Sequence, residues 1–207
     1  MPQMTAKLKK TLLICSCAAA TVAAICTIYV RAHPLVFNES FFGHAHCMKG
    51  GGIALDTYAH DHNGRFPYHT NGYGDALLLM TNEVGDWWAS VTGPGYTGQP
   101  FLNALATGSN LAEQACGRVY VQGLSETNNP EIVLLFDKLP TPGGDHCHFL
   151  RRISAPLGRE VWTVGSGMRF VPASKWPAYS KEQIELLAAA GIAREKAEMY
   201  YSEVSKR

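Results

Sequence analysis

The chain has 207 residues, which is enough for one domain with appendages and too few for two full domains. It carries 18 Lys and Arg residues against 17 Asp and Glu residues, so its formal charge is nearly balanced. We therefore expect no surface field of a single sign and no binding to nucleic acid.

Residues 11–30 form an almost wholly apolar segment without a charged side chain. A helix of about 20 residues rises about 30 Å, which is the thickness of the hydrocarbon core of a bilayer. Lys7, Lys9 and Lys10 precede the segment and only Arg31 follows it closely. This lysine bias predicts a single membrane crossing with the N-terminus in the cytoplasm and the rest of the chain exported.

Two alternatives remain for this N-terminal segment. A signal peptide cleaved after Ala32 would fit the small-residue pattern loosely, although the apolar stretch is longer than usual and Arg31 lies at the cut. Lipid attachment at Cys15, Cys17 or Cys26 is less well supported by the residues before them and by the length of the apolar run. We favour the retained anchor.

An amphipathic helix is predicted beyond the apolar segment, in the extension that ends at residue 63. Small or apolar residues recur there at helical spacing: Met48, Gly52, Leu55 and Ala59. The pair Asn63-Gly64 predicts the end of the helix, because glycine readily adopts the left-handed conformation of a C-cap. Three glycines at 50–52 oppose a helix by about 1 kcal/mol each, so either the helix begins there or packing requires a bare backbone.

The following region gives weaker signals. A short helix is predicted at 75–83, and the glycines from residue 93 onward indicate a long loop. Strands are predicted at 118–122, 132–136, 161–164 and 168–171. The pair Gly165-Ser166 predicts a type II′ turn that closes the last two strands into a hairpin.

The C-terminal part predicts one more helix. Ser180 followed by Gln183 has the spacing of a capping box, so the helix should begin near Lys181. Ile184 and Leu187 give its next turns an apolar stripe.

These elements predict an α+β fold in which a long N-terminal helix, partly transmembrane and partly amphipathic, packs on an antiparallel sheet. The predicted division of the chain is a basic cytoplasmic tail, a transmembrane helix, an extracytoplasmic helical extension, an antiparallel sheet domain with long loops, and a C-terminal helix. Their residue ranges are 1–10, 11–30, 31–63, 64–178 and 179–207.

Several stretches of the chain resemble a known family. They are Cys47-Met48-Lys49, Gly52-Ile53-Ala54-Leu55, Tyr58-Ala59, Asp61-His62-Asn63-Gly64-Arg65-Phe66-Pro67, Val119-Tyr120-Val121-Gln122-Gly123-Leu124, Leu134-Leu135-Phe136-Asp137-Lys138, Met168-Arg169-Phe170-Val171 and Trp176-Pro177. In this order they resemble bacterial pseudopilin-like proteins related to type II secretion and type IV pilins. They cover well under half of the chain.

The resemblance implies a structural or assembly component of a secretion or filament system rather than an enzyme. It implies a location in the cell inner membrane with a periplasmic or extracellular C-terminal domain, and self-association or contact with other pilin-like subunits through the N-terminal helix. The chain departs from the family at two places. The peptidase site of glycine, an aromatic residue and glutamate is absent around residues 11–13, and Gly165-Ser166 stands where the family has an Asp-Gly turn.

Histidines gather in short clusters, which raises the alternative of an exported metal-binding protein or metal-dependent enzyme. The clusters are His44 with His46, His60 with His62 and His69, and His146 with His148 around Cys147. Imidazole and thiolate are good zinc or copper ligands, yet the paired spacing of a structural zinc site is missing. We expect solvated loop histidines, no metal and no other cofactor.

Other motifs are better explained by structural roles than by binding or catalysis. Asp61, Asn63 and Gly64 match only the first half of a calcium loop, and a helix C-cap explains them better. Gly165-Ser166-Gly167 lacks the frame of a nucleophile elbow. The carboxylates Asp137 and Asp145 are too far apart in sequence to be paired, and the adjacent Trp87 and Trp88 suit packing. We expect no catalytic residue.

Three cysteines lie outside the apolar segment, at positions 47, 116 and 147. In an oxidising compartment two of them could pair, and the sequence alone does not identify which. We take Cys116 with Cys147 as the working hypothesis.

Overall fold

The computed structural model describes residues 20–22, 24, 48–82, 92–96, 98–142 and 156–202. It divides the chain into two units, 1–41 and 42–207, and the fold described here belongs to the second. Within the described residues, no helix has the length and apolar character needed to cross a bilayer. The predicted anchor at 11–30 lies outside the described residues except for 20–22 and 24.

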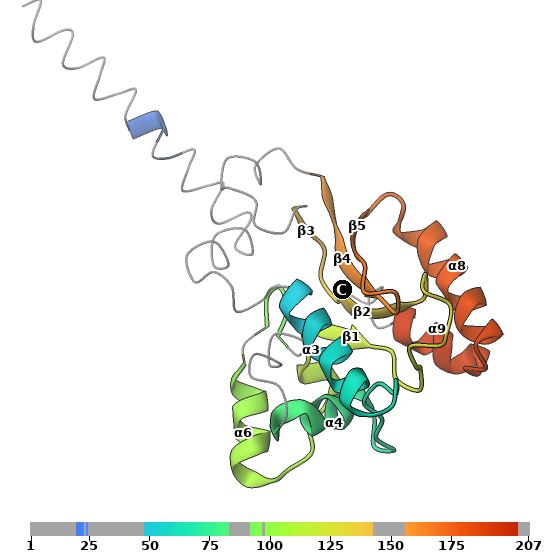
Figure 1. The fold of residues 1–207 in the computed structure, drawn as a ribbon. Coiled ribbons are helices and arrows are strands. Elements are labelled where there is room, and N and C mark those ends of the chain that lie inside the picture. Colours follow the sequence, from blue (N-terminus) through green and yellow to red (C-terminus); the bar gives the residue numbers. More distant parts are fainter. Residues whose placement is uncertain are drawn as a thin grey trace, which may run out of the picture. The chain divides into compact units, whose positions relative to one another are not determined.

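The fold is α+β, with an antiparallel sheet and helices that follow it at the C-terminal end (Figure 1). The sheet consists of β1 (Arg118–Tyr120), β2 (Val133–Asp137), β3 (Thr141–Pro142), β4 (Leu157–Thr163) and β5 (Met168–Pro172). The helices are α3 (Met48–Asp61), α4 (Tyr73–Leu78), α6 (Gln99–Thr107), α8 (Trp176–Ala189) and α9 (Arg194–Ser202), with the short 3₁₀ helices η1 (Leu79–Asn82) and η2 (Glu113–Ala115).

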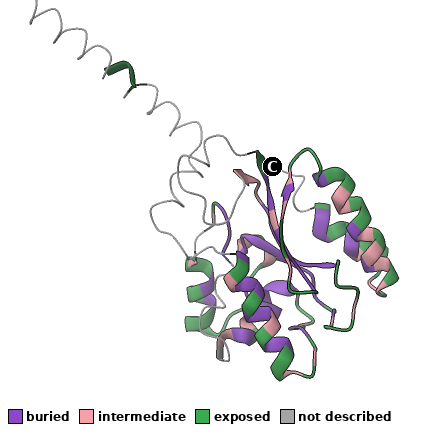
Figure 2. Cartoon of the chain, turned by 45° about the horizontal axis from the view of Figure 1, so that its top comes forward, coloured by how far each residue is buried: buried purple, intermediate pink, exposed green. Residues whose placement is uncertain are grey.

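The sheet is ordered β1-β2-β4-β5, and every pairing is antiparallel. β3 pairs with the first residues of β4 and β2 with its last residues, so β2 and β3 lie along the same side of β4. All residues of β2 are buried, as Figure 2 shows for the centre of the sheet. This confirms the prediction that the apolar run after residue 131 is a buried strand.

Helix α3 confirms the predicted amphipathic helix and its end. Met48, Leu55 and Ala59 are fully buried on one side of it. Asn63 and Gly64 both adopt positive φ, at 56° and 75°. The Gly64 amide donates a hydrogen bond of 2.8 Å to the Ala59 carbonyl, which closes the last turn as a glycine C-cap does.

Opposite faces of the sheet are covered by different helices. Val161 and Trp162 are neighbours in β4, so their side chains point to opposite faces. Trp162 meets α3 at Gly52. Val161 pairs with Phe136, whose ring stacks on Tyr201 of α9 and lies 5.4 Å from Trp176 of α8. The sheet is therefore enclosed between α3 and the C-terminal helices.

The C-terminal region corrects the prediction of one helix that begins near Lys181. Ser180 is not an N-cap: α8 begins at Trp176 with Pro177 in its first turn, where a proline needs no backbone donor. Gln183 instead binds the sheet, accepting a hydrogen bond from the Val133 amide at 2.8 Å. Gly191, at φ 88°, separates α8 from α9, so the segment holds two helices.

The β4–β5 hairpin confirms the predicted strand pair and corrects its turn. Ser166, at φ 58°, adopts the left-handed conformation, and its amide donates a hydrogen bond to the Thr163 carbonyl at 3.0 Å. This is a longer loop than a two-residue type II′ turn. The role of Gly165 is close packing, because a Cβ there would lie 2.7 Å from Pro130 Cβ.

The segment predicted as a sheet domain also contains helices. The short helix expected at 75–83 is present as α4 with η1. Helix α6, in contrast, replaces part of the expected glycine-rich loop. It begins with Pro100 in its first turn and ends at Gly108, whose φ is 63°.

Candidate functional site

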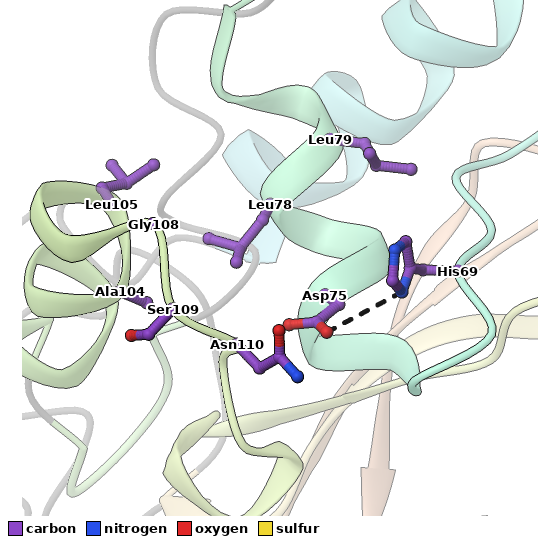
Figure 3. A pocket seen from close by; sticks show the side chains of 9 residues that line it. All are labelled: His69, Asp75, Leu78, Leu79, Ala104, Leu105, Gly108, Ser109 and Asn110. Carbon is purple, nitrogen blue, oxygen red and sulfur yellow. Dashed lines mark ion pairs between the residues drawn. The ribbon is translucent and has the colours of Figure 1, made fainter.

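A pocket of about 260 Å³ lies beside α4, η1 and α6. Figure 3 shows His69 and Asp75 at one end and Leu78 directed toward α6 at the other. The lining residues come from the loop before α4, from α4 and η1, and from α6 with the loop after it: His69, Asp75, Leu78, Leu79, Ala104, Leu105, Gly108, Ser109 and Asn110. Their side chains combine one carboxylate, one imidazole, the polar groups of Ser109 and Asn110, and an aliphatic wall.

The Asp75 carboxylate is held in a fixed orientation, with a side chain that is only 8% exposed. One oxygen, Oδ1, accepts a hydrogen bond from the Leu111 amide at 2.7 Å. The other, Oδ2, accepts one from Asn71 Nδ2 at 3.1 Å. The bond from Leu111 ties the first turn of α4 to the chain after α6, the bond from Asn71 ties it to the loop before α4, and both donors are neutral.

His69 lies next to this carboxylate. Its Nδ1 is 3.7 Å from Asp75 Oδ2, which is too long for a hydrogen bond. The same Nδ1 accepts the Asn71 amide proton at 3.2 Å, so a neutral His69 carries its proton on Nε2. That tautomer differs from the one in a His-Asp pair that activates a nucleophile, where Nδ1 donates to the carboxylate. The geometry of His69 and Asp75 therefore does not match a pair of that kind.

The aliphatic wall faces solvent. Leu79 and Leu105 are both exposed, and Leu102 on the same helix is more exposed still. Residues 98–112 contain no charged side chain. Surface helices usually present polar residues outward, so this exposed aliphatic surface is unusual.

A buried ion pair forms a second polar feature, between directly opposed residues of β1 and β2. Arg118 Nε lies 2.9 Å from Asp137 Oδ1, and both side chains are almost completely buried. Burial raises the pKa of Asp137, although Arg118 and, more weakly, Arg159 act to lower it. We assign this pair to the stability and register of the sheet, because it lies inside the fold.

Arg159 on β4 lies over the ring of Trp176, with 4.7 Å between the guanidinium carbon and the ring centroid. Its Nε is buried and has no hydrogen-bond partner among the described residues. Burial lowers the pKa of Arg159, and Asp137 acts in the opposite direction. Tyr179, beside Trp176, has its pKa raised by burial to about 12. These groups join β4 to α8.

The histidines of the described region serve different roles. His60 is exposed on α3. His62 stacks on the Tyr58 ring at 3.8 Å, and its Nδ1 lies 2.8 Å from the Tyr58 carbonyl, so it contributes to the end of α3. His69 lies at the pocket, and the structure therefore does not bring these three together as ligands. Over the part of the chain that the structure describes, no group of three His, Cys, Asp or Glu side chains could hold a metal ion.

Several candidates from the sequence lie outside the described residues: His44, His46, Cys47, Trp87, Trp88, Asp145, His146, Cys147 and His148. The metal hypothesis at 146–148 and the disulfide hypothesis therefore stay predictions. Cys116 is described and is buried, with Sγ 3.8 Å from the Ala112 carbonyl oxygen. Asp137 is in the sheet ion pair, and Ser166 is in the hairpin turn.

No motif or spacing in the sequence predicted the pocket. Asp75 and Leu105 are separated by thirty positions, and no spacing rule connects them. The available signal was the charge-free stretch at 98–112, which is unusual for a surface segment.

No protein-family model, curated protein or solved structure matches the chain.

Proposed function

We propose that the chain is a membrane-anchored, pilin-like or pseudopilin-like component with a structural or assembly role in a secretion or filament system. In this proposal residues 11–30 form the anchor in the cell inner membrane, with residues 1–10 in the cytoplasm. The domain that follows is periplasmic or extracellular. The N-terminal helix mediates contact with other copies or with pilin-like subunits, and the protein is not an enzyme.

The observation that carries the proposal is the attachment of α3 to the sheet. A Cβ on Gly52 would overlap the Trp162 ring, at 2.0 Å from Cδ2. Trp162 Nε1 also donates a hydrogen bond of 3.4 Å to Asp56 Oδ1 on the same helix. The helix that follows the predicted anchor is thus docked tightly on an antiparallel sheet, an arrangement that suits a subunit whose N-terminal helix holds its globular part.

The opposite side of α3 supports a role in contact. Lys49, Ile53, Thr57 and His60 are exposed, and they follow one another at helical spacing. Ile53 places an aliphatic group on this side, with 47% of its surface exposed. Such a stripe can pack against a helix from a second subunit without displacing the sheet.

The test combines membrane extraction with site-specific crosslinking in cells. We expect the chain to stay in the membrane after a carbonate wash and its C-terminus to be protected from protease added on the cytoplasmic side. A photo-crosslinking residue at Ile53 should give crosslinks identified by mass spectrometry as a second copy or a pilin-like subunit. The matched control is Met199 on α9, which is 45% exposed.

Two results would overturn the proposal. Complete release of the chain by carbonate would show that residues 11–30 do not anchor it in the membrane. If position 53 gives no more crosslinks than position 199, α3 has no role in assembly.

A further inference from the structure

We propose that the pocket beside α4 and α6 binds a primary ammonium group on an aliphatic chain, from a free alkylamine or from a lysine side chain. The proposal concerns a different part of the fold from the assembly role above and does not depend on it. It rests on the charge of the pocket, the tautomer of His69 and the aliphatic wall.

The pocket has an uncompensated negative charge when His69 is neutral. Asp75 is buried and receives hydrogen bonds only from the neutral groups Leu111 N and Asn71 Nδ2 among the described residues. Each carboxylate oxygen can accept about two hydrogen bonds, so both oxygens keep capacity for another donor. None of the nine lining residues is Lys or Arg. A buried carboxylate is costly without a cation nearby, and a ligand ammonium would supply it.

A neutral His69 does not supply the positive charge that would compensate the Asp75 carboxylate. Nδ1 then accepts the Asn71 amide proton and turns a lone pair, rather than a donor, toward the region of Asp75. A ligand that brings its own positive charge suits both Asp75 and His69. It can donate to Asp75, and it leaves the bond between His69 and Asn71 in place.

The aliphatic wall of the pocket suits an aliphatic stem, with Ser109 and Asn110 as the other polar lining residues. Leu78, Leu79, Ala104 and Leu105 line it, and Figure 3 shows Leu78 and Leu105 on the side away from His69. Its 260 Å³ corresponds to about nine water molecules at roughly 30 Å³ each, and it lies just below the range of pockets for drug-sized ligands. A single side chain or a short amine is the size that fits.

Other ligand classes fit less well. An anion would meet the Asp75 carboxylate without a lysine or arginine to hold it. A metal ion would need several ligands, and the described residues offer no such cluster. A wholly apolar ligand would exclude water from the Asp75 carboxylate without donating a hydrogen bond to it, and this desolvation is unfavourable.

The experiment uses the full chain in lipid nanodiscs with ¹³C-labelled leucine methyl groups. The probes are N-acetyl-lysine methylamide, its uncharged counterpart N-acetyl-norleucine methylamide, and pentylamine. We expect the lysine probe, pentylamine or both to shift the methyl signals of Leu78 and Leu105, with the norleucine probe at least about tenfold weaker than the lysine probe. Binding of the lysine probe alone would identify a protein side chain as the ligand, and binding of pentylamine alone would identify a free amine.

Three variants sharpen the test. Asp75→Asn keeps the shape and removes the charge, and it should weaken amine binding about tenfold or more; its unfolding temperature shows whether the fold is retained. Leu105→Ser removes part of the aliphatic wall at an exposed position and should weaken binding a few fold. Leu102→Ser lies on the same helix outside the pocket and should leave binding unchanged.

The proposal is overturned if neither amine shifts these methyl groups, or if the lysine probe shifts them and the norleucine probe binds as tightly. Equal amine affinity for wild type and a folded Asp75→Asn variant would overturn it as well. Should Asp75→Asn fail to fold, equal effects of Leu105→Ser and Leu102→Ser would have the same consequence.

Discussion

The ring of Trp162 occupies the space that a side chain at Gly52 would need, because a Cβ at position 52 would lie 2.0 Å from Cδ2 of the ring. This contact explains why α3 contains a glycine that opposes helix formation. The helix gains a close approach to β4, and the tryptophan gains a hydrogen bond to Asp56 one turn further along α3.

Replacing Gly52 by alanine should therefore destabilise the fold. Alanine favours a helix over glycine by about 1 kcal/mol, but the added methyl group forces the Trp162 ring to move, and overpacking costs about 1–3 kcal/mol or more. We expect a net loss of about 2 kcal/mol in the free energy of unfolding, measured by urea titration of the full chain in detergent micelles. Thr57→Ala, at an exposed position of the same helix, should change it by less than about 0.5 kcal/mol. A Gly52→Ala variant as stable as wild type would contradict the packing argument.

The buried pair of Arg118 and Asp137 should show strong coupling in a double-mutant cycle. Removing one partner leaves a charge buried inside the sheet, so Arg118→Met or Asp137→Leu should each cost about 3–5 kcal/mol. The double variant should recover a large part of this loss, because neither charge remains. The control is the exposed pair of Arg169 and Glu131, where Arg169→Met should cost less than about 1 kcal/mol. Additive effects at positions 118 and 137 would show that the pair is not coupled.

Asp56 should make stability depend on pH. Burial raises the pKa of this carboxyl above its ordinary value of 3.8, although hydrogen bonds from Ser166 and Trp162 act to lower it. The folded state thus binds its proton more tightly than the unfolded chain does. The contribution to stability is full below the unfolded pKa and is lost as the pH rises through the folded pKa. Asp56→Asn should match wild type at low pH and become relatively more stable near neutral pH.

Urea titrations of wild type and Asp56→Asn at a series of pH values from 4 to 7 would show whether the variant gains stability relative to wild type as the pH rises. The opposite order, with the variant losing stability relative to wild type as the pH rises, would show that the ionised carboxylate is the better partner for Trp162 and Ser166.

Much of the sheet and of α3 could be predicted from local patterns. The apolar run after residue 131 contains β2, and the helical spacing from Met48 to Ala59 with the Asn63-Gly64 end defines α3. Such features depend on neighbours in sequence, so the residues themselves carry the signal. The bounds of α8 could not be read in the same way. Gln183 looked like part of a capping box, whereas its amide side chain binds the sheet, a contact fixed by tertiary structure.

Helix α6 and the pocket escaped prediction for two different reasons. The glycines around residues 93–98 indicated a loop, whereas the structure has a helix with Pro100 in its first turn and Gly108 at its end. The pocket depends on how the chain after α6 returns to Asp75, where the Leu111 amide binds the carboxylate. A contact between residues 36 positions apart has no local pattern, so the sequence could not place it.

The pairing of Cys116 with Cys147 stays a prediction that thiol titration can check. If the two are joined in an oxidising compartment, closing a loop of about 30 residues should stabilise the fold by roughly 3–4 kcal/mol in the chain-entropy treatment. We expect unreduced, denatured protein to show one reactive thiol, at Cys47, outside the apolar segment, and Cys116→Ser to expose a second at Cys147. Three reactive thiols outside that segment in unreduced wild type would rule out any disulfide among these cysteines.

We expect residues 146–148 to hold no structural metal ion. The residues at 146–148 offer two imidazoles and a thiol close together, but a structural zinc takes four ligands in defined pairs. A structural zinc contributes on the order of 10 kcal/mol to folding, so its removal should be easy to detect. We expect a chelator to leave the unfolding temperature of the full chain unchanged, and the double variant His146→Ala with His148→Ala to unfold at the same temperature as wild type. A large fall on chelation that zinc or copper reverses, and that the double variant reproduces without chelator, would favour a metal-binding protein over the assembly component proposed above.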